Sequence, residues 1–244
     1  MNTDFCKEAL EKFCGCDNSE IEAGSLQQPA IWLFGLEHGT YKSKNDENVN
    51  TREEFEDENY SIDTQLKWPY NKKAFKLLAA MRKEYGVKKY KEFAQDYQPF
   101  VKDSPGFFKG NLYPYPCNNV GEWSKKAQAE TGFPTKEKYL QWCKEHRLPR
   151  IKSWVEEYAP KLFIGVGITN RNEFSIAMFG ELVEFTEKEI IVNGQKKRIF
   201  FYAKCNNRLV VIPHFSGRYG LNSDESLQRV GVFLEEFQSV TRNP

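Results

Sequence analysis

The sequence predicts an α/β fold: a three-layer sandwich in which helices flank a central, mostly parallel sheet of four to five strands, with a β-hairpin near residues 182–204. Three short apolar runs favour this fold, because each has the length of a buried strand and ends at glycine or proline. They are residues 31–34 (IWLF), 162–167 (LFIGVG) and 209–212 (LVVI). Alternation of such strands with helices is typical of a parallel sheet covered on both faces.

Helical patterns fill most of the chain between these strands, and a further helix is expected soon after residue 167. Pro149 is expected to divide one long pattern into two helices. Asn193 and Gly194 are a turn signal within the hairpin, whereas residues 105–116 (PGFFKGNLYPYP) contain so much proline and glycine that we expect turns there. The helical patterns cover residues 3–14, 71–85, 88–97, 135–158 and 224–239.

The length of the chain indicates how many domains it forms, and its net charge limits which partners are expected. A chain of 244 residues fits a single domain, residues 1–244, with a polar, acidic loop insertion at residues 42–63. Lys and Arg number 35 and Asp and Glu number 34, so the net charge of +1 does not by itself indicate nucleic-acid binding. Any basic surface must be local, and lysine and arginine do gather between residues 72 and 91.

The six cysteines and the N-terminal residues favour a cytoplasmic protein. The cysteines are irregularly spaced, and the segment from Met1 lacks the basic start and apolar core of a signal peptide. No apolar run reaches membrane-spanning length, so we expect no membrane partner. Cys14 and Cys16 do not have the usual spacing of iron–sulfur ligands, so we expect free thiols and no cofactor. We also expect a monomer.

Polar side chains stand where the apolar strands end. Glu37 and His38 follow the first strand, and His214 and Ser216 follow the last. Ligands of α/β proteins bind beyond the carboxyl ends of the strands, although charges at such turns are also common in surface loops. The sequence has no H-E-x-x-H zinc spacing, no phosphate-binding loop and no G-x-S-x-G elbow. His214 and Ser216 are two residues apart, and we expect no productive hydrogen bond between them.

Five short segments, in a fixed order, carry more information together than any one carries alone. They are residues 35–39 (GLEHG), 69–70 (PY), 111–114 (NLYP), 164–167 (IGVG) and 214–218 (HFSGR). This set resembles the motifs of the uracil-DNA glycosylase superfamily, G-x-[N/D]-P-G, a Pro-aromatic pair, N-L-x-P, I-G-V-G and H-P-S-P-R. The resemblance is nearest to the single-strand-selective monofunctional branch and extends over residues 31–222.

The resemblance implies a uracil-DNA glycosylase-like fold and a monofunctional DNA glycosylase. Such an enzyme flips a damaged or 5-modified pyrimidine out of DNA and hydrolyses its N-glycosidic bond, leaving an abasic site. The candidate bases are uracil, hydroxymethyluracil and a modified cytosine such as glucosylated hydroxymethylcytosine. The expected setting is base-excision repair or defence against phage. The alternative is a catalytically inactive member that binds DNA or a nucleotide.

The resemblance also implies roles for individual residues. Glu37 would position water beneath the sugar, and His214 would face the oxygen of the departing base. Tyr70 would stack on the flipped base, and Asn111 would read its polar edge. At the loop after the last strand, Ser216 and Gly217 would hold phosphate, while the side chains that would fill the gap in the duplex are Arg218 and also Tyr219 or Leu221.

Several positions depart from the family pattern. Glu37 replaces the usual Asn or Asp, and its extra methylene would shift the carboxylate. His38 replaces a proline and is expected near the base, where it could orient Glu37, contact phosphate or itself activate water. Phe215 and Gly217 replace both prolines of the last motif. Gly39 stands where uracil-specific members have a tyrosine, which implies room for a substituent on the 5-position of the base.

Overall fold

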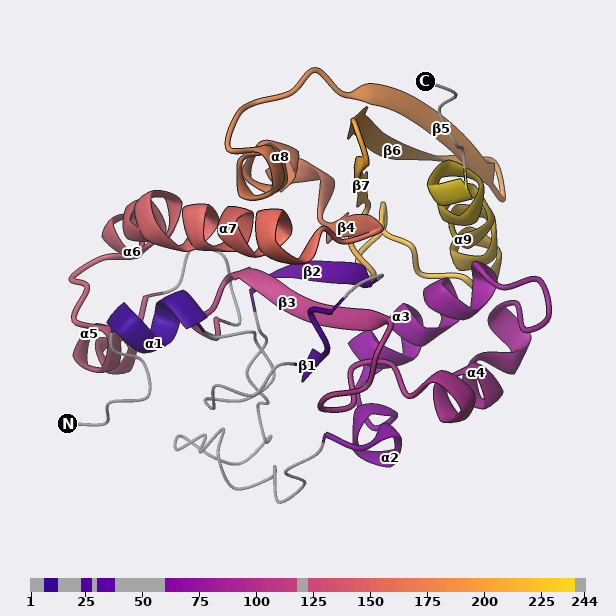
Figure 1. Ribbon diagram of the computed structural model, residues 1–244, viewed down its shortest axis with the longest axis horizontal. Helices are drawn as coiled ribbons and strands as arrows, with labels where there is room; N and C mark the ends of the chain where they lie inside the picture. Colours follow the sequence, from indigo (N-terminus) through magenta and orange to yellow (C-terminus); the bar gives the residue numbers. More distant parts are fainter. Residues whose placement is uncertain (1–6, 13–22, 28–29, 38–59, 118–122, 240–244) are drawn as a thin grey trace.

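Seven strands form one sheet in the computed structural model, which describes residues 7–12, 23–27, 30–37, 60–117 and 123–239 (Figure 1). The order of the strands across the sheet is β1-β3-β2-β4-β7-β6-β5. The neighbours β3, β2, β4 and β7 are parallel, and the others join antiparallel. The strands are β1 (Ala23–Gly24), β2 (Ile31–Glu37), β3 (Phe107–Tyr113), β4 (Leu162–Val166), β5 (Thr186–Val192), β6 (Gln195–Lys204) and β7 (Asn207–Ile212).

The predicted α/β class and the parallel strands are confirmed, but the expected number of strands is wrong. The hairpin β5–β6 does not stand apart from the sheet; β6 pairs with β7 and extends it. Its turn lies at Asn193 and Gly194, which both have positive φ, 49° and 73°. Two consecutive residues with positive φ define the turn that matches the twist of a two-stranded hairpin.

Strand β3 corrects the expectation of turns at residues 105–116. All seven of its residues are buried, and it pairs with β2 in parallel from Ile31↔Phe107 to Glu37↔Tyr113. Lys109 and Gly110 interrupt the apolar run, which is why the pattern did not indicate a strand. Gly110 is required there, because a Cβ atom on it would lie 2.7 Å from the ring of Phe34.

Each predicted helical pattern corresponds to a helix of the structure, but two boundaries differ, and the short helices at Ile62–Gln65 and Lys125–Thr131 lie outside the predicted patterns. The first long pattern ends earlier than expected, at Ala80 rather than residue 85, and Pro149 lies in the first turn of a helix and does not separate two helices. A π-helical turn at Cys143–Arg147 makes residues 136–158 continuously helical. The helices are α1 (Lys7–Lys12), α2 (Ile62–Gln65), α3 (Pro69–Ala80), α4 (Tyr90–Tyr97), α5 (Lys125–Thr131), α6 (Lys136–Trp142), α7 (Leu148–Tyr158), α8 (Arg171–Phe179) and α9 (Asp224–Ser239), with 3-10 turns at Val87–Lys89 and Ile168–Asn170.

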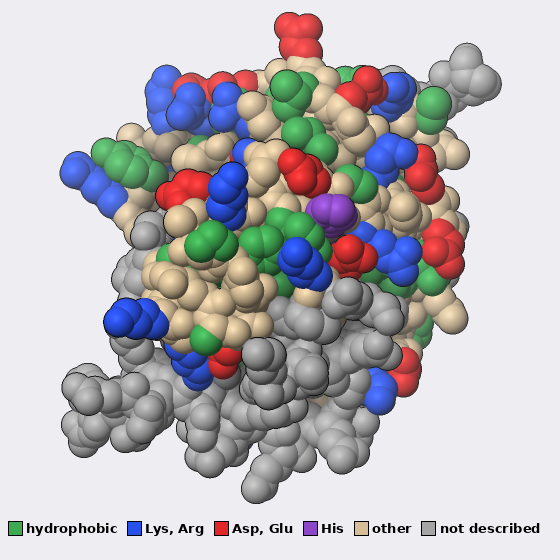
Figure 2. Space-filling model, turned by 90° about the vertical axis from the view of Figure 1, so that its left-hand side faces the viewer, with side chains coloured by type: hydrophobic (Ala, Val, Ile, Leu, Met, Phe, Trp, Pro, Cys, Tyr) green, Lys and Arg blue, Asp and Glu red, His purple; other side chains and the backbone are tan. Residues whose placement is uncertain are grey.

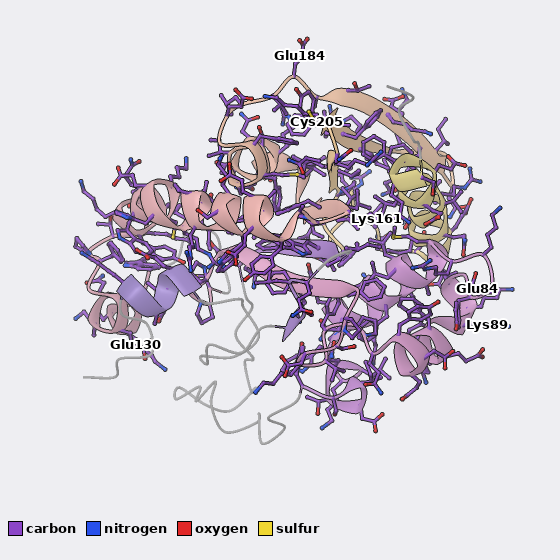
Figure 3. All side chains as sticks on the ribbon, in the orientation of Figure 1. Glu84, Lys89, Glu130, Lys161, Glu184 and Cys205 are labelled. Atoms are coloured by element: carbon purple, nitrogen blue, oxygen red, sulfur yellow. The ribbon has the colours of Figure 1, made fainter. Side chains whose placement is uncertain are left out.

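Two hydrophobic cores lie on opposite faces of the sheet because successive strand residues point to opposite sides. In β2, Ile31 and Leu33 join the core under α3, α4 and α9, whereas Trp32 and Phe34 join the core under α7 and α8. Figure 1 shows these two groups of helices on either side of β2 and β4. Side chains fill the layers between them, while the labelled Glu84 and Glu184 point outward (Figure 3).

The described surface carries both signs of charge. On the face that Figure 2 shows, Lys and Arg side chains alternate with Asp and Glu side chains, in keeping with a net charge of +1. None of the described helices is long and apolar enough to cross a membrane. The predictions for residues 42–59 of the acidic insertion, and for Cys14 and Cys16, lie outside the described residues; Tyr60 to Asp63 lead into and begin α2.

Helices α3 and α9 pack closely at Gly231, and we expect Gly231→Ala to destabilise the fold. The added Cβ atom would lie 2.4 Å from Ala80 Cβ and 2.8 Å from the Leu77 carbonyl oxygen. Overpacking of this kind costs about 1–3 kcal/mol. Urea unfolding measures the loss, with Val232→Ala on the exposed side of the same helix as the control. Equal stability of the two variants would contradict the close packing.

Candidate functional site

The carboxyl ends of the four parallel strands meet at one edge of the sheet. Register pairs Gly35 of β2 with Asn111 of β3, and Glu37 with Tyr113. On the other side of β2, Phe34 pairs with Gly165 of β4, and the end of β4 pairs with Ile212 at the end of β7. Glu37 and Asn111 are therefore held on neighbouring strands, and His214 follows β7 at the same edge, where α/β proteins bind ligands.

Gly35, Asn111 and Tyr70 are in close contact at this edge. A Cβ atom on Gly35 would lie 2.5 Å from Asn111 Oδ1 and 3.3 Å from the hydroxyl oxygen of Tyr70. The absence of a side chain at Gly35 therefore lets the amide and the phenol approach the strand. The Asn111 residue is only 8% exposed, and its backbone carbonyl oxygen accepts a hydrogen bond of 3.2 Å from Arg147 Nη2. The amide side chain of a residue at this strand end carries both a donor and an acceptor with which it can recognise a ligand.

Tyr70 reaches the site because α3 begins beside it. Pro69 occupies the first turn of α3, where the missing N–H of proline does no harm and its fixed φ suits a helix. The Tyr70 ring packs edge-on against Phe215, with ring centroids 5.0 Å apart. Phe215 is 2% exposed, and its carbonyl oxygen accepts a hydrogen bond from Lys73 of α3. Phe215, which stands where the motif H-P-S-P-R has a proline, thus fixes the His214 loop against α3.

His214 is held as a neutral imidazole with a defined tautomer. Its Nδ1 accepts a hydrogen bond from the backbone N–H of Ser216 at 3.2 Å, so the ring proton of the neutral form is on Nε2. Partial desolvation and the cation of Lys73 both lower the pKa of His214 below its ordinary value of 6.5. At pH 7 the side chain therefore offers one N–H donor on the side of the ring away from Ser216.

The expectation that His214 and Ser216 cannot hydrogen-bond is wrong. Ser216 Oγ lies 2.8 Å from His214 Nδ1. The reason is local, because a turn at Gly217, which has a φ of 82°, folds the loop back on itself and Leu221 N–H donates to the His214 carbonyl oxygen at 2.8 Å. The serine therefore belongs to the turn that orients the imidazole.

Glu37 forms an ion pair that the sequence did not indicate. Lys136 Nζ lies 2.9 Å from Glu37 Oε1 and 3.1 Å from Oε2, and the two side chains are only 5% and 13% exposed. Lys136 is the first residue of α6, 99 positions further along the chain. Burial raises the pKa of Glu37 above its ordinary value, and the cation of Lys136 opposes this effect. No spacing rule could have found Lys136, because it lies 99 positions away from Glu37 in the sequence.

The remaining predicted residues lie on the loop or outside the described residues. Ser216, Gly217, Arg218 and Tyr219 are exposed, and the Arg218 guanidinium lies 5.7 Å from the centre of the Tyr219 ring. Tyr219 is 76% exposed, more than any other large hydrophobic side chain in the described part of the chain. Leu221 is completely buried, so its suggested insertion into DNA is wrong.

Some predicted features of the site are not seen among the described residues, and one cavity lies away from the site. His38 and Gly39 are outside the described residues, so their predicted places beside the base are not part of the geometry above. Among residues that the structure describes, no three His, Cys, Asp or Glu side chains gather to hold a metal ion, and Cys143 and Cys205 are free thiols. A cavity of about 430 Å³ lies elsewhere, between Tyr85–Lys88 and the first turns of α9.

Comparison with known proteins adds no family assignment. The chain matches none of the protein-family models searched and none of the curated proteins.

The close approach at Gly35 predicts the effect of Gly35→Ala. The new methyl group must displace the Asn111 amide, and we expect a loss of about 1–3 kcal/mol in the free energy of unfolding. Urea unfolding measures this loss, and the NMR signals of the Asn111 side-chain amide should shift. In an Asn111→Ala background the same change should cost less, because the clashing amide is gone. An equal cost in both backgrounds would disprove this explanation.

The raised pKa of Glu37 predicts a pH-dependent difference between the wild type and Glu37→Gln. A carboxyl group with a higher pKa in the folded state binds protons more tightly there, so its contribution to stability falls as pH rises from the ordinary value of 4.5 through the folded pKa. The Glu37→Gln variant has no carboxyl group at this position, so its stability does not fall with pH for this reason. Its stability relative to the wild type should therefore increase with pH across this window.

Urea unfolding at a series of pH values measures this difference. Glu84→Gln, at an exposed position, serves as the control (Figure 3). A difference between wild type and Glu37→Gln that stays constant or falls with pH would show that Glu37 is not desolvated.

Proposed function

We propose that the protein is a monofunctional DNA glycosylase that hydrolyses the N-glycosidic bond of a flipped, damaged or 5-modified pyrimidine. The observation that carries the proposal is the convergence of Gly35, Asn111, Tyr70 and the His214 loop at one sheet edge. These residues come from four of the five segments that resemble the superfamily motifs, and the fifth segment is β4 with Gly167, between β2 and β7. Parallel pairing accounts for the four segments at strand ends, and the contact of Tyr70 with Phe215 adds the start of α3 to the same edge, which supports the proposal.

The spacing of the strands suits a nucleoside between Glu37 and His214. Strand β4 separates β2 from β7, so two strand spacings, about 10 Å, lie between the two strand ends. Glu37 stands at the end of β2, and His214 follows β7 by two residues. A sugar and its base would then lie above β4, with a carboxylate on one side and an imidazole on the other.

The proposed reaction uses one water molecule. Glu37 accepts a proton from the water molecule while the oxygen of that water bonds to the anomeric carbon of the sugar. The electron pair of the breaking C–N bond leaves with the base, and the oxygen of the base that becomes anionic accepts a hydrogen bond from His214 Nε2–H. A neutral imidazole suits this role, because it donates this hydrogen bond without transferring its proton.

Base recognition would fall to Asn111 and Tyr70. The buried Asn111 amide offers both a donor and an acceptor to the polar edge of a pyrimidine, and an amide can turn to suit uracil or cytosine. Tyr70 would stack on the base. The exposed Arg218 and Tyr219 would enter the gap in the duplex, and Ser216 and Gly217 would approach phosphate. Repair and anti-phage defence are the two settings in which such an activity would serve.

A binding module that does not cleave DNA is the second candidate. One observation favours it: both oxygens of Glu37 already contact Lys136, which competes with a water molecule for the carboxylate. In this case the same edge would recognise a base or nucleotide through Asn111 and Tyr70 without hydrolysis.

A panel of oligonucleotides separates the two candidates. The substrates carry uracil, hydroxymethyluracil or glucosylated hydroxymethylcytosine, and alkali after incubation reveals abasic sites. We expect cleavage of at least one substrate. In Glu37→Gln and His214→Ala the rate should fall by about 100-fold or more. His146→Ala, an exposed histidine on the α6 side, should retain the wild-type rate. Binding of a modified strand without abasic sites would favour the module.

The contact between His214 and Ser216 gives one further control. Ser216→Ala should retain most of the cleavage, because Ser216 would orient the imidazole and contact phosphate without attacking the sugar. Loss of all cleavage in this variant, together with labelling of the wild type by a serine-directed phosphonate, would instead indicate a serine hydrolase.

A further inference from the structure

Lys136 is a buried cation at the proposed catalytic carboxylate. We propose that it is a positioning residue, which keeps Glu37 charged and fixes the direction of its two oxygens. This inference rests on the proposed function for its catalytic meaning, but the ion pair itself does not depend on that function. The motifs of the sequence did not include Lys136.

The geometry restricts Glu37 more than a single contact would. Nζ of Lys136 lies within 3.1 Å of both carboxylate oxygens, at 2.9 Å from Oε1 and 3.1 Å from Oε2. Lys136 is held in place from its own helix, because Thr135 caps α6 by accepting a hydrogen bond from the Lys138 N–H. Both side chains are almost fully buried, so contact of both carboxylate oxygens with one Nζ atom limits how Glu37 can turn.

The position of Lys136 is unfavourable for a lysine by ordinary rules. Lysine is rarely buried, and a cation in the first turn of a helix opposes the helix dipole at a cost of about 0.3–1 kcal/mol. A buried ion pair is also a weak source of stability, because both charges lose their hydration. A residue that breaks these local rules is typical of a functional site. Lys136 fits this description, because its known partner is the proposed base.

Lys136 supplies the positive charge near Glu37 among the described residues. The other titratable groups that interact with the carboxylate are Tyr113 on β3, Tyr139 on α6 and Cys143 in the π-helical turn. Burial raises the pKa of each, that of Cys143 to about 12, so all three are neutral near pH 7. They cannot replace the cation.

The chemistry of the proposed reaction requires that charge. A protonated Glu37 can neither accept a proton from water nor stabilise the positive charge that develops on the sugar. Burial alone favours the protonated form, and Lys136 opposes it. Removing Lys136 should therefore raise the pKa of Glu37 further, and the acid limb of the pH–rate profile should move to higher pH.

The experiment compares Lys136→Gln, Lys136→Met and Lys136→Arg with Lys138→Gln, an exposed lysine of the same helix. The first readout is a ¹³C NMR titration of the Glu37 carboxyl carbon, assigned by its loss in Glu37→Gln. The second is kcat/KM against pH on whichever uracil, hydroxymethyluracil or glucosylated hydroxymethylcytosine oligonucleotide the wild type cleaves. Circular dichroism shows which variants fold, and Met keeps the length of the side chain without its charge.

We expect the NMR midpoint and the acid limb to move to higher pH in the Gln and Met variants, with kcat/KM reduced about tenfold or more at the acidic end. The Arg variant should keep most of the wild-type profile because it keeps the charge, and Lys138→Gln should match the wild type. An unchanged midpoint in the Gln and Met variants would overturn the inference. A purely structural role would lower the unfolding temperature without moving either midpoint.

Failure of the proposed function would look different. In that case the wild type would cleave none of the three substrates, while the NMR titration would still reveal whether Lys136 sets the charge of Glu37. An active wild type whose acid limb stays unchanged in the Gln and Met variants would reject the role of Lys136 alone.

Discussion

The parallel pairing of β3, β2, β4 and β7 is the constraint on which the candidate site depends. Hydrogen bonds between parallel strands fix their register, and here that register places Glu37, Asn111, Gly167 and His214 at or just beyond one edge. Two cores, one on each face, prevent any strand from slipping, because a shift of one residue would turn Trp32 and Leu33 to the wrong sides. The stability of the sheet and the geometry of the site therefore have the same origin.

Some of this arrangement could be predicted from sequence, and some could not. The runs at residues 31–34 and 209–212 are continuous and apolar, which is enough to indicate strands. Strand β3 escaped detection because Lys109 is buried among polar and aromatic partners, Tyr60 and Asn71, that come from distant segments. A sequence pattern reflects residues that are close along the chain, so it does not indicate contacts between residues that meet only after folding.

The same reasoning applies to the candidate site. Motif order brought forward Glu37, Tyr70, Asn111 and His214, and the fold places their strands and helix together. Lys136 was missed because its partner is 99 positions away, and the insertion of Leu221 was wrongly expected because exposure cannot be read from a residue type. The pairing of charges that are distant in the sequence and the burial of a side chain are both properties of packing.

The contact between Tyr70 and Phe215 joins two parts of the site that would have separate tasks. Tyr70 belongs to α3, beside the proposed site of the base, and Phe215 follows His214 directly in the chain. Any ligand that pushes the tyrosine ring aside must open this aromatic contact or carry the histidine loop with it. Fit and reactivity are then mechanically linked: a poorly fitting base would be penalised in the rate of bond breaking as well as in its residence time.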